Sequence, residues 1–186
     1  MPPGGVIVDI GANIGAFTLD CAARFPAARI DAYEPNPRAF RMLQENIAAN
    51  RLDGRVRAYR EAVGRAAGVL ELWGSGSSLT TTAYPNATDR GGLPAVCPVI
   101  DLQTVLARAG GAAALVKLDA EGAEADIIEG GRTVLRGISQ CVGEYHVDRV
   151  PDVIDRCRST LEAAGFDFAW SCTRRCGPLF HARRLD

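Results

Sequence analysis

The sequence predicts a doubly wound α/β fold, built as a single domain over residues 1–186. Short β-rich runs alternate along the chain with segments whose apolar residues recur at helical spacing, and this alternation is typical of a sheet with helices on both faces. The chain has the length of one domain and contains no internal repeat. Acidic residues follow the ends of several β-rich runs, and ligands bind at that edge of an open parallel sheet.

The first quarter of the chain predicts two strand-helix units. Residues 6–9 form the first expected strand, and a helix follows over about 15–24. The second strand is expected at 29–34. The helix after it should start at Pro37, because Asn36 can cap it and proline suits the first helical position.

The middle of the chain is less regular. A third strand is expected over 55–63, and 68–73 could return as a hairpin arm after a turn at Gly64. Residues 74–94 lack periodicity and are rich in Gly, Ser, Thr and Pro, so we expect a long loop that acts as a mobile cover. Asp101 should cap a short helix.

The last part of the chain supplies the remaining elements. A fourth strand is expected at 115–119, followed by a helix over about 123–136 that Gly130 and Gly131 weaken. A fifth strand should cover 139–146. The next helix should begin near Pro151 and end before Gly165. The runs "FDFAWS" and "PLFHARRL" predict a closing antiparallel hairpin at the sheet edge.

Composition narrows the class of protein. The formal net charge is −1, and the twenty arginines are spread among twenty-two acids, which argues against a nucleic-acid partner. Neither an apolar run of about 18 residues nor a signal peptide is visible, so we expect a cytoplasmic protein without a membrane partner. The six cysteines lack Cys-x-x-Cys spacing and are expected to be free thiols; no metal site is predicted from them.

The turn after the first strand, "DIGANIG", points to a particular ligand. Gly11 and Gly15 let the backbone approach a ligand closely, but their spacing is not that of a dinucleotide fingerprint. A carboxylate at Asp9 would repel a diphosphate and suits a ligand with an ammonium group and hydroxyls. Glu34 stands near the offset at which an acid takes ribose hydroxyls. S-adenosylmethionine, a nucleoside with a cationic amino-acid arm, fits this description.

The motifs "VIVDIGANIGAFTL", "AYEPNP", "EAVG", "VKLDAEGAEADIIEGG" and "GEYH" follow one another from Val6 to about His146. In these motifs the sequence resembles the FkbM family of S-adenosylmethionine-dependent methyltransferases. The first motif is shared by several kinds of methyltransferase, whereas "KLDAEGAE" is far more particular. The resemblance implies a Rossmann-like class I methyltransferase fold with a seven-stranded, mostly parallel sheet that ends in an antiparallel hairpin.

The resemblance also implies cofactor-binding roles. The turn of Gly11, Ala12, Asn13 and Gly15 would cradle the methionine arm, and Asp9 would orient the turn and the ammonium group. For Asp9 alone, a turn or helix cap is the alternative. The remaining cofactor-binding residues would be Glu34 at the ribose diol, Asn36 beside the adenosine, Glu61 and Ala62 along the adenine, and Asp119.

Strand alternation indicates where the chemistry lies. Lys117 and Asp119 should share one side of their strand, and Glu144 and His146 one side of the next, about 4.8 Å away. We therefore predict Asp119, Glu144 and His146 as catalytic residues, with His146 as the base, because an unperturbed imidazole titrates near neutrality. A solvated strand-end histidine is the alternative for His146. Lys117, the single lysine, should pair with Glu144 or Asp119.

A divalent ion held by Asp119, Glu121, Glu144 and His146 is an alternative route to an activated hydroxyl. His181, on an edge strand, is expected to be structural.

The function that these residues favour is O-methylation of a hydroxyl on a small natural product or sugar. An NAD-type oxidoreductase and a non-catalytic methyltransferase-like binding module are the alternatives. A nucleic-acid amino methyltransferase is disfavoured, because the fourth strand ends in "DAEG" and not in an Asn-Pro-Pro-aromatic pattern. The first strand begins by Val6, so we expect the acceptor to be covered by the long loop, a second subunit of a homodimer or another domain.

Overall fold

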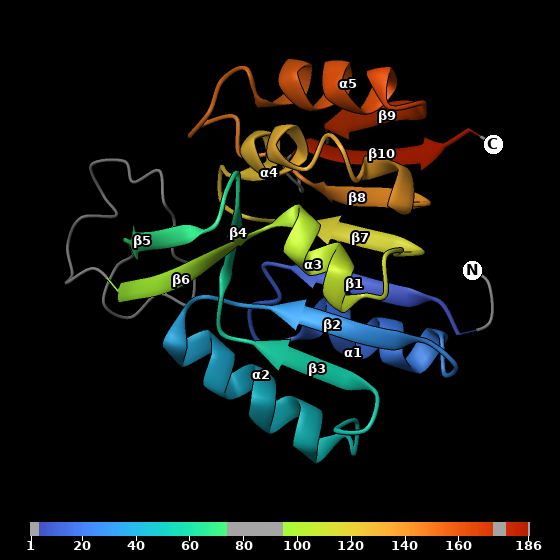
Figure 1. Ribbon diagram of the computed structural model, residues 1–186. Helices are drawn as coiled ribbons and strands as arrows, with labels where there is room; N and C mark the ends of the chain where they lie inside the picture. The colour runs from blue at the N-terminus through green and yellow to red at the C-terminus, as the bar shows by residue number, and fades with distance from the viewer. Residues whose placement is uncertain (1–3, 74–94, 173–177, 186) are drawn as a thin grey trace.

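The computed structural model describes residues 4–73, 95–172 and 178–185 and shows the expected α/β architecture (Figure 1). A seven-stranded sheet has the order β3-β2-β1-β7-β8-β10-β9. Its strands are β1 (Val6–Ile10), β2 (Arg29–Tyr33), β3 (Val56–Tyr59), β7 (Leu115–Leu118), β8 (Gln140–Glu144), β9 (Phe166–Cys172) and β10 (Pro178–Arg184). The first five of these run parallel, and β10 is antiparallel to both of its neighbours. The predicted mostly parallel sheet with a closing antiparallel hairpin is confirmed.

Helices cover both faces of this sheet. The helices are α1 (Ala16–Arg24), α2 (Pro37–Ala49), α3 (Leu102–Arg108), α4 (Glu124–Gly130) and α5 (Val153–Ala163). One core cluster joins α1 and α2 to Ile7 and Ile30, and the other joins α3, α4 and α5 to Val8, Val116 and Phe180. Neighbouring strand residues point to opposite faces, so the continuous apolar runs of the central strands fill both cores.

Two of the helices begin at the predicted caps. The Asn36 side chain accepts hydrogen bonds from the amides of Arg38 and Ala39, and the Asp101 carboxylate accepts one from Thr104. The predicted helix after the fourth strand is shorter than expected, because α4 ends at Gly130 and a short 3₁₀ helix (Leu135–Gly137) follows. The pair Gly130 and Gly131 ends this helix instead of only weakening it.

A second, smaller sheet corrects the prediction for the middle of the chain. The expected strand over 55–63 divides into β3 and β4 (Ala62–Gly64), and β5 (Gly68–Leu72) does not pair with β4. The strand β6 (Ala95–Asp101), which the sequence analysis missed, lies between them, parallel to β4 and antiparallel to β5. The chain leaves the main sheet at Glu61, whose carboxylate is bound by Arg108 at the end of α3.

The smaller sheet stands beyond the carboxyl ends of the parallel strands (Figure 1). It therefore borders the edge of the main sheet at which the strand order reverses between β1 and β7. Ligands bind at this edge in such sheets. The predicted loop over 74–94 lies outside the described residues. In the described part of the chain, no helix has the length and apolar character needed to cross a membrane.

Candidate active site

The glycine turn after β1 packs directly on the end of β7. The amides of Gly11 and Ala12 both donate to the carbonyl of Tyr33, each at 3.0 Å. Gly11 and Gly15 have positive φ angles of 75° and 95°, and a Cβ atom on Gly11 would lie 1.8 Å from the carbonyl oxygen of Asp119. Only glycine fits at position 11, because any side chain would separate the turn from β7.

Glu34 lies just past the end of β2 and is almost fully buried. Its Oε2 accepts a hydrogen bond from the amide of Asn13 at 2.8 Å, and its Oε1 accepts one from the amide of Asn36 at 2.7 Å. Burial raises the pKa of Glu34 to about 7, although both backbone hydrogen bonds act to lower it. A carboxylate offers about four lone-pair positions, so acceptor capacity remains for two further donors. The Asn36 side chain is used as the α2 cap, so only its backbone contacts Glu34.

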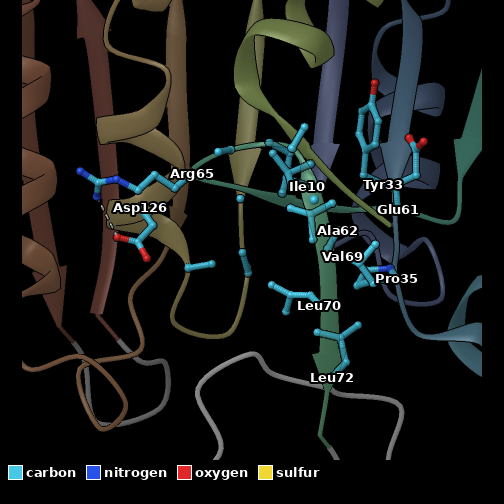
Figure 2. A pocket seen from close by; sticks show the side chains of 18 of the residues that line it. Ile10, Tyr33, Pro35, Glu61, Ala62, Arg65, Val69, Leu70, Leu72 and Asp126 are labelled. Atoms are coloured by element: carbon cyan, nitrogen blue, oxygen red, sulfur yellow. Dashed lines mark hydrogen bonds and ion pairs between the residues drawn. The ribbon is translucent and has the colours of Figure 1, made fainter. Parts of the chain in front are cut away.

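A cavity of about 360 Å³ opens beside the glycine turn (Figure 2). Glu61 and Ala62 line it together with Gly11. Its other lining residues come from the ends of β1 and β2, from β5, and from α4 and the segment before it, including Ile10, Tyr33, Pro35, Val69, Leu70, Leu72, Ala120, Ala123 and Asp126. Figure 2 shows an apolar wall from β5 and the Arg65–Asp126 ion pair at one side. The bond to Arg108 fixes the carboxylate of Glu61 at the cavity. The cavity thus joins three of the predicted cofactor-binding residues.

Lys117 links the glycine turn to two carboxylates. Its Nζ lies 2.6 Å from the carbonyl oxygen of Gly11, 3.2 Å from Asp9 Oδ1 and 3.3 Å from Asp119 Oδ2. Asp119 was an expected partner, whereas Asp9 was not, and Glu144 does not pair with Lys117. Burial acts to lower the pKa of Lys117, but the attraction of Asp9 and Asp119 outweighs it and raises that pKa, so the ammonium stays charged.

The position of Asp9 follows from strand register. Asp9 on β1 lies directly opposite Lys117 on β7, and its side chain is fully buried. Its Oδ2 also accepts a hydrogen bond from the Thr18 hydroxyl at 2.6 Å. Asp9 therefore supports the turn through Lys117 and α1 and does not face the cavity.

His146 lies among three carboxylates. Its Nδ1 is 2.9 Å from Glu124 Oε1, and its Nε2 is 3.6 Å from Glu121 Oε2 and 3.8 Å from Asp119 Oδ1. Burial acts to lower the pKa of His146, but the hydrogen bond and the negative charges raise it to about 9. The expectation of an imidazole that titrates near neutrality is wrong for this arrangement. In the described part of the chain, no group of three or more His, Cys, Asp or Glu side chains is arranged to hold a metal ion.

Glu144 faces a different space. β8 ends at Glu144, so strand alternation does not extend to His146. The Glu144 side chain lines a second cavity of about 270 Å³ with Phe17 of α1, Lys117, Asp119, Val142 and Leu179. Asp119 connects the cavity that Glu144 lines to the carboxylate cluster around His146, since it lines this cavity and approaches His146. Sequence reasoning missed Glu124, for which the available signal was an acid in the first turn of α4.

Comparisons with known proteins show the family and the fold of the chain. Residues 9–168 match the family model of the methyltransferase FkbM domain. Over 86 residues the chain is 38% identical to the 31-O-demethyl-FK506 methyltransferase FkbM of Streptomyces tacrolimicus, which covers 46% of this chain and 29% of that protein. It is 30% identical over 163 residues to the AMB antimetabolite synthetase AmbE of Pseudomonas aeruginosa, over 81% of this chain and 7% of AmbE.

A solved structure shows the same fold. The methyltransferase FkbM from Methylobacillus flagellatus KT superposes with a TM-score of 0.68 at 16% identity, over 97% of this chain and 44% of that chain. The chain spans less than a third of the length of the curated relatives named above.

Proposed function

The chain belongs to the FkbM methyltransferase family, and on that premise we propose that it transfers a methyl group from S-adenosylmethionine to a hydroxyl of a small natural product or sugar. The fold and family are those of S-adenosylmethionine-dependent methyltransferases. The observation that carries the proposal is the junction of the glycine turn, Glu34 and Asp119 at the carboxyl ends of β1, β2 and β7. The proposed acceptor is a small molecule with a hydroxyl group and not a nucleic acid. That the chain forms a homodimer remains a prediction.

The residues at this edge fit the cofactor. Glu34 retains acceptor positions for a ribose diol, and the 360 Å³ cavity beside Glu61 and Ala62 offers a largely apolar place for adenine. Behind the glycine turn, the charges of Asp9 and Asp119 exceed that of Lys117 by one negative charge. That balance favours a ligand with a cationic arm over a dinucleotide with a pyrophosphate. When bound, S-adenosylmethionine supplies an electrophilic methyl group on a sulfonium.

The cavity that Glu144 lines is the proposed place of the acceptor. Phe17, Val142 and Leu179 offer apolar contacts to an acceptor body, and Asp119 and Glu144 can accept the hydrogen bond of its hydroxyl. The side chain of Glu144 has no hydrogen bond or ion pair with other described residues. Asp119 borders both this cavity and the glycine turn, so an acceptor there would lie beside the cofactor. Aligning the nucleophile with the methyl group and the leaving sulfur would supply much of the rate.

The product of transfer tests the function. The protein should be incubated with S-adenosylmethionine carrying a labelled methyl group and with an extract of its source, and labelled products should be identified by mass spectrometry. We expect label on an oxygen atom of a small molecule. Label on nitrogen or carbon would contradict O-methylation, and cofactor binding without transfer to any acceptor would favour a non-catalytic binding module.

His146→Ala tests the base. The pKa of His146 is raised to about 9, so its side chain is an imidazolium at neutral pH. It can accept a proton only as the pH approaches 9. If His146 is the base, kcat/KM of the wild-type protein should rise about tenfold per pH unit up to about pH 9 and then level off. His146→Ala should lower kcat by about 100-fold and remove this limb. Unchanged turnover and an unchanged pH profile would show that His146 is not the base.

Cofactor affinity should increase with pH around neutrality. The pKa of Glu34 is raised to about 7, so below that pH the carboxyl is increasingly protonated and loses acceptor capacity for a ribose diol. The Kd for S-adenosylmethionine should fall by up to about tenfold per unit as the pH rises from 6 toward 7, and it should be nearly constant above 8. Calorimetric titration at pH 6, 7 and 8 measures this. Glu34→Gln should bind more weakly and show no such dependence; an equal dependence in that variant would assign it to another group.

A further inference from the structure

Glu124 is a buried carboxylate that the proposed reaction does not use directly. It is the first residue of α4, and its side chain is fully buried. Its Oε1 accepts hydrogen bonds from the amides of Ala120 at 2.9 Å and Gly122 at 3.2 Å, and it lies 2.9 Å from His146 Nδ1. Its Oε2 is buried and has no hydrogen-bond partner in the part of the chain that the structure describes. Three donors therefore converge on one oxygen atom.

This arrangement determines the protonation of His146. An ionised carboxylate can only accept, so Nδ1 of His146 must carry the proton between them. The imidazole is then held with Nε2 toward Asp119 and Glu121. The two amides that Glu124 binds belong to the loop that follows Asp119, in which Glu121 and Gly122 have positive φ angles of 52° and 106°. Glu124 thus holds both His146 and the loop that carries Asp119.

We infer that Glu124 is a positioning residue of the methyl-transfer site, which keeps Nδ1 of His146 protonated and directs Nε2 to Asp119. The inference rests on the proposed function, because it takes Asp119 as a group beside the acceptor and His146 as the base next to Asp119. Glu124 itself has no exposed surface, so it would not contact either substrate. Its effect on the reaction passes through His146.

The charges around His146 come from three segments. Glu124 approaches from α4, Asp119 and Glu121 from the loop after β7, and Arg149 from the segment after His146, where its Nε lies 3.4 Å from Glu121 Oε2. Glu124→Gln removes one of the three negative charges and leaves the shape of the side chain nearly unchanged. The remaining Oε1 could still accept hydrogen bonds, so the loop contacts can persist while the preference for the imidazolium weakens.

NMR of the histidine rings tests this inference without an acceptor. The chain has two histidines. His181 lies on β10 beside Gln140, away from this cluster, so its ring signals serve as an internal control. The signals that disappear in the His181→Gln variant are those of His181. In Glu124→Gln we expect the pKa of His146 to fall by at least about one unit from its value of about 9, toward an ordinary imidazole. Glu129→Gln is the matched control, because this α4 carboxylate pairs with Arg156 and Arg65 instead.

Kinetics give a second readout. In Glu124→Gln, kcat at neutral pH should rise by up to about tenfold, because a pKa lowered by about one unit leaves up to about ten times more of His146 unprotonated. The rising part of the pH profile should move with the pKa found by NMR, and KM for S-adenosylmethionine should stay within about twofold. A folded Glu124→Gln variant with an unmoved His146 pKa would overturn the inference. If that variant does not fold, the ¹⁵N shifts of wild-type His146 above pH 10 decide: a proton on Nδ1 supports the inference, and a proton on Nε2 overturns it. If the wild-type protein transfers no methyl group, the proposed function fails while this NMR result still stands.

Discussion

Lys117→Met is expected to destabilise the protein by about 3–5 kcal/mol, because it leaves the buried carboxylate of Asp9 without its cation. Asp9 is fully buried, and Lys117 is its only ion-pair partner among the described residues. The same variant removes the hydrogen bond from Nζ to the carbonyl of Gly11 and so loosens the cofactor turn. Urea denaturation at pH 7 measures the change in the free energy of unfolding.

Two further variants separate the buried charge from other effects of this substitution. Adding Asp9→Asn to Lys117→Met removes the unpaired charge, so the double variant should be more stable than Lys117→Met alone. Arg24→Met removes an exposed ion pair with Asp20 and should change stability far less. A Lys117→Met protein as stable as the Arg24→Met protein would refute the role of Lys117 as the link between the turn and the strands.

Gly11→Ala is expected to reduce stability and to abolish measurable cofactor binding. A residue with a Cβ atom at this positive φ costs about 1–2 kcal/mol, and the Cβ would also lie 1.8 Å from the Asp119 carbonyl oxygen. The turn and the end of β7 would have to move apart, which separates the residues that converge on the cofactor. Denaturation and calorimetry with S-adenosylmethionine measure the two effects.

Gly165→Ala is the matched control for this substitution. Gly165 follows α5 with a positive φ of 88°, but a Cβ there meets no atom within 4 Å. It should show the conformational cost alone and bind the cofactor with wild-type affinity. Equal effects of the two substitutions would mean that contact with Asp119 is unimportant.

Local signals predicted most of the fold. The alternation of strands and helices, the caps Asn36 and Asp101, and the closing hairpin depend on neighbouring residues, and the structure confirms them. The strand β6 was missed because its partners β4 and β5 are chosen by tertiary packing, and sequence spacing suggested that β5 would pair with β4. The third strand was overextended for the same reason, since the bond between Glu61 and Arg108 joins residues far apart in the chain.

The site was predictable in its position but not in its electrostatics. Parallel strands place Asp9, Glu34 and Asp119 at one edge of the sheet, which the sequence shows. The pairing of Asp9 with Lys117 depends on the register of β1 and β7, and the raised pKa of His146 depends on carboxylates from α4 and the loop before it. Neither the pairing of Asp9 with Lys117 nor the raised pKa of His146 can be predicted from residues that are neighbours in the sequence. Glu124 was missed because its importance comes from the three donors that fold around it.

Calorimetric titration of the wild-type protein with S-adenosylmethionine and, separately, with NAD tests the central claim most directly. The glycine turn, the acceptor capacity of Glu34 and the net negative charge behind the turn favour a cationic nucleoside without phosphate. We expect S-adenosylmethionine to bind at a single site at pH 8, with an affinity that Glu34→Gln lowers by at least about tenfold, since hydrogen bonds to a charged group are lost. NAD should show no binding. Tight binding of NAD without binding of S-adenosylmethionine would contradict the assignment.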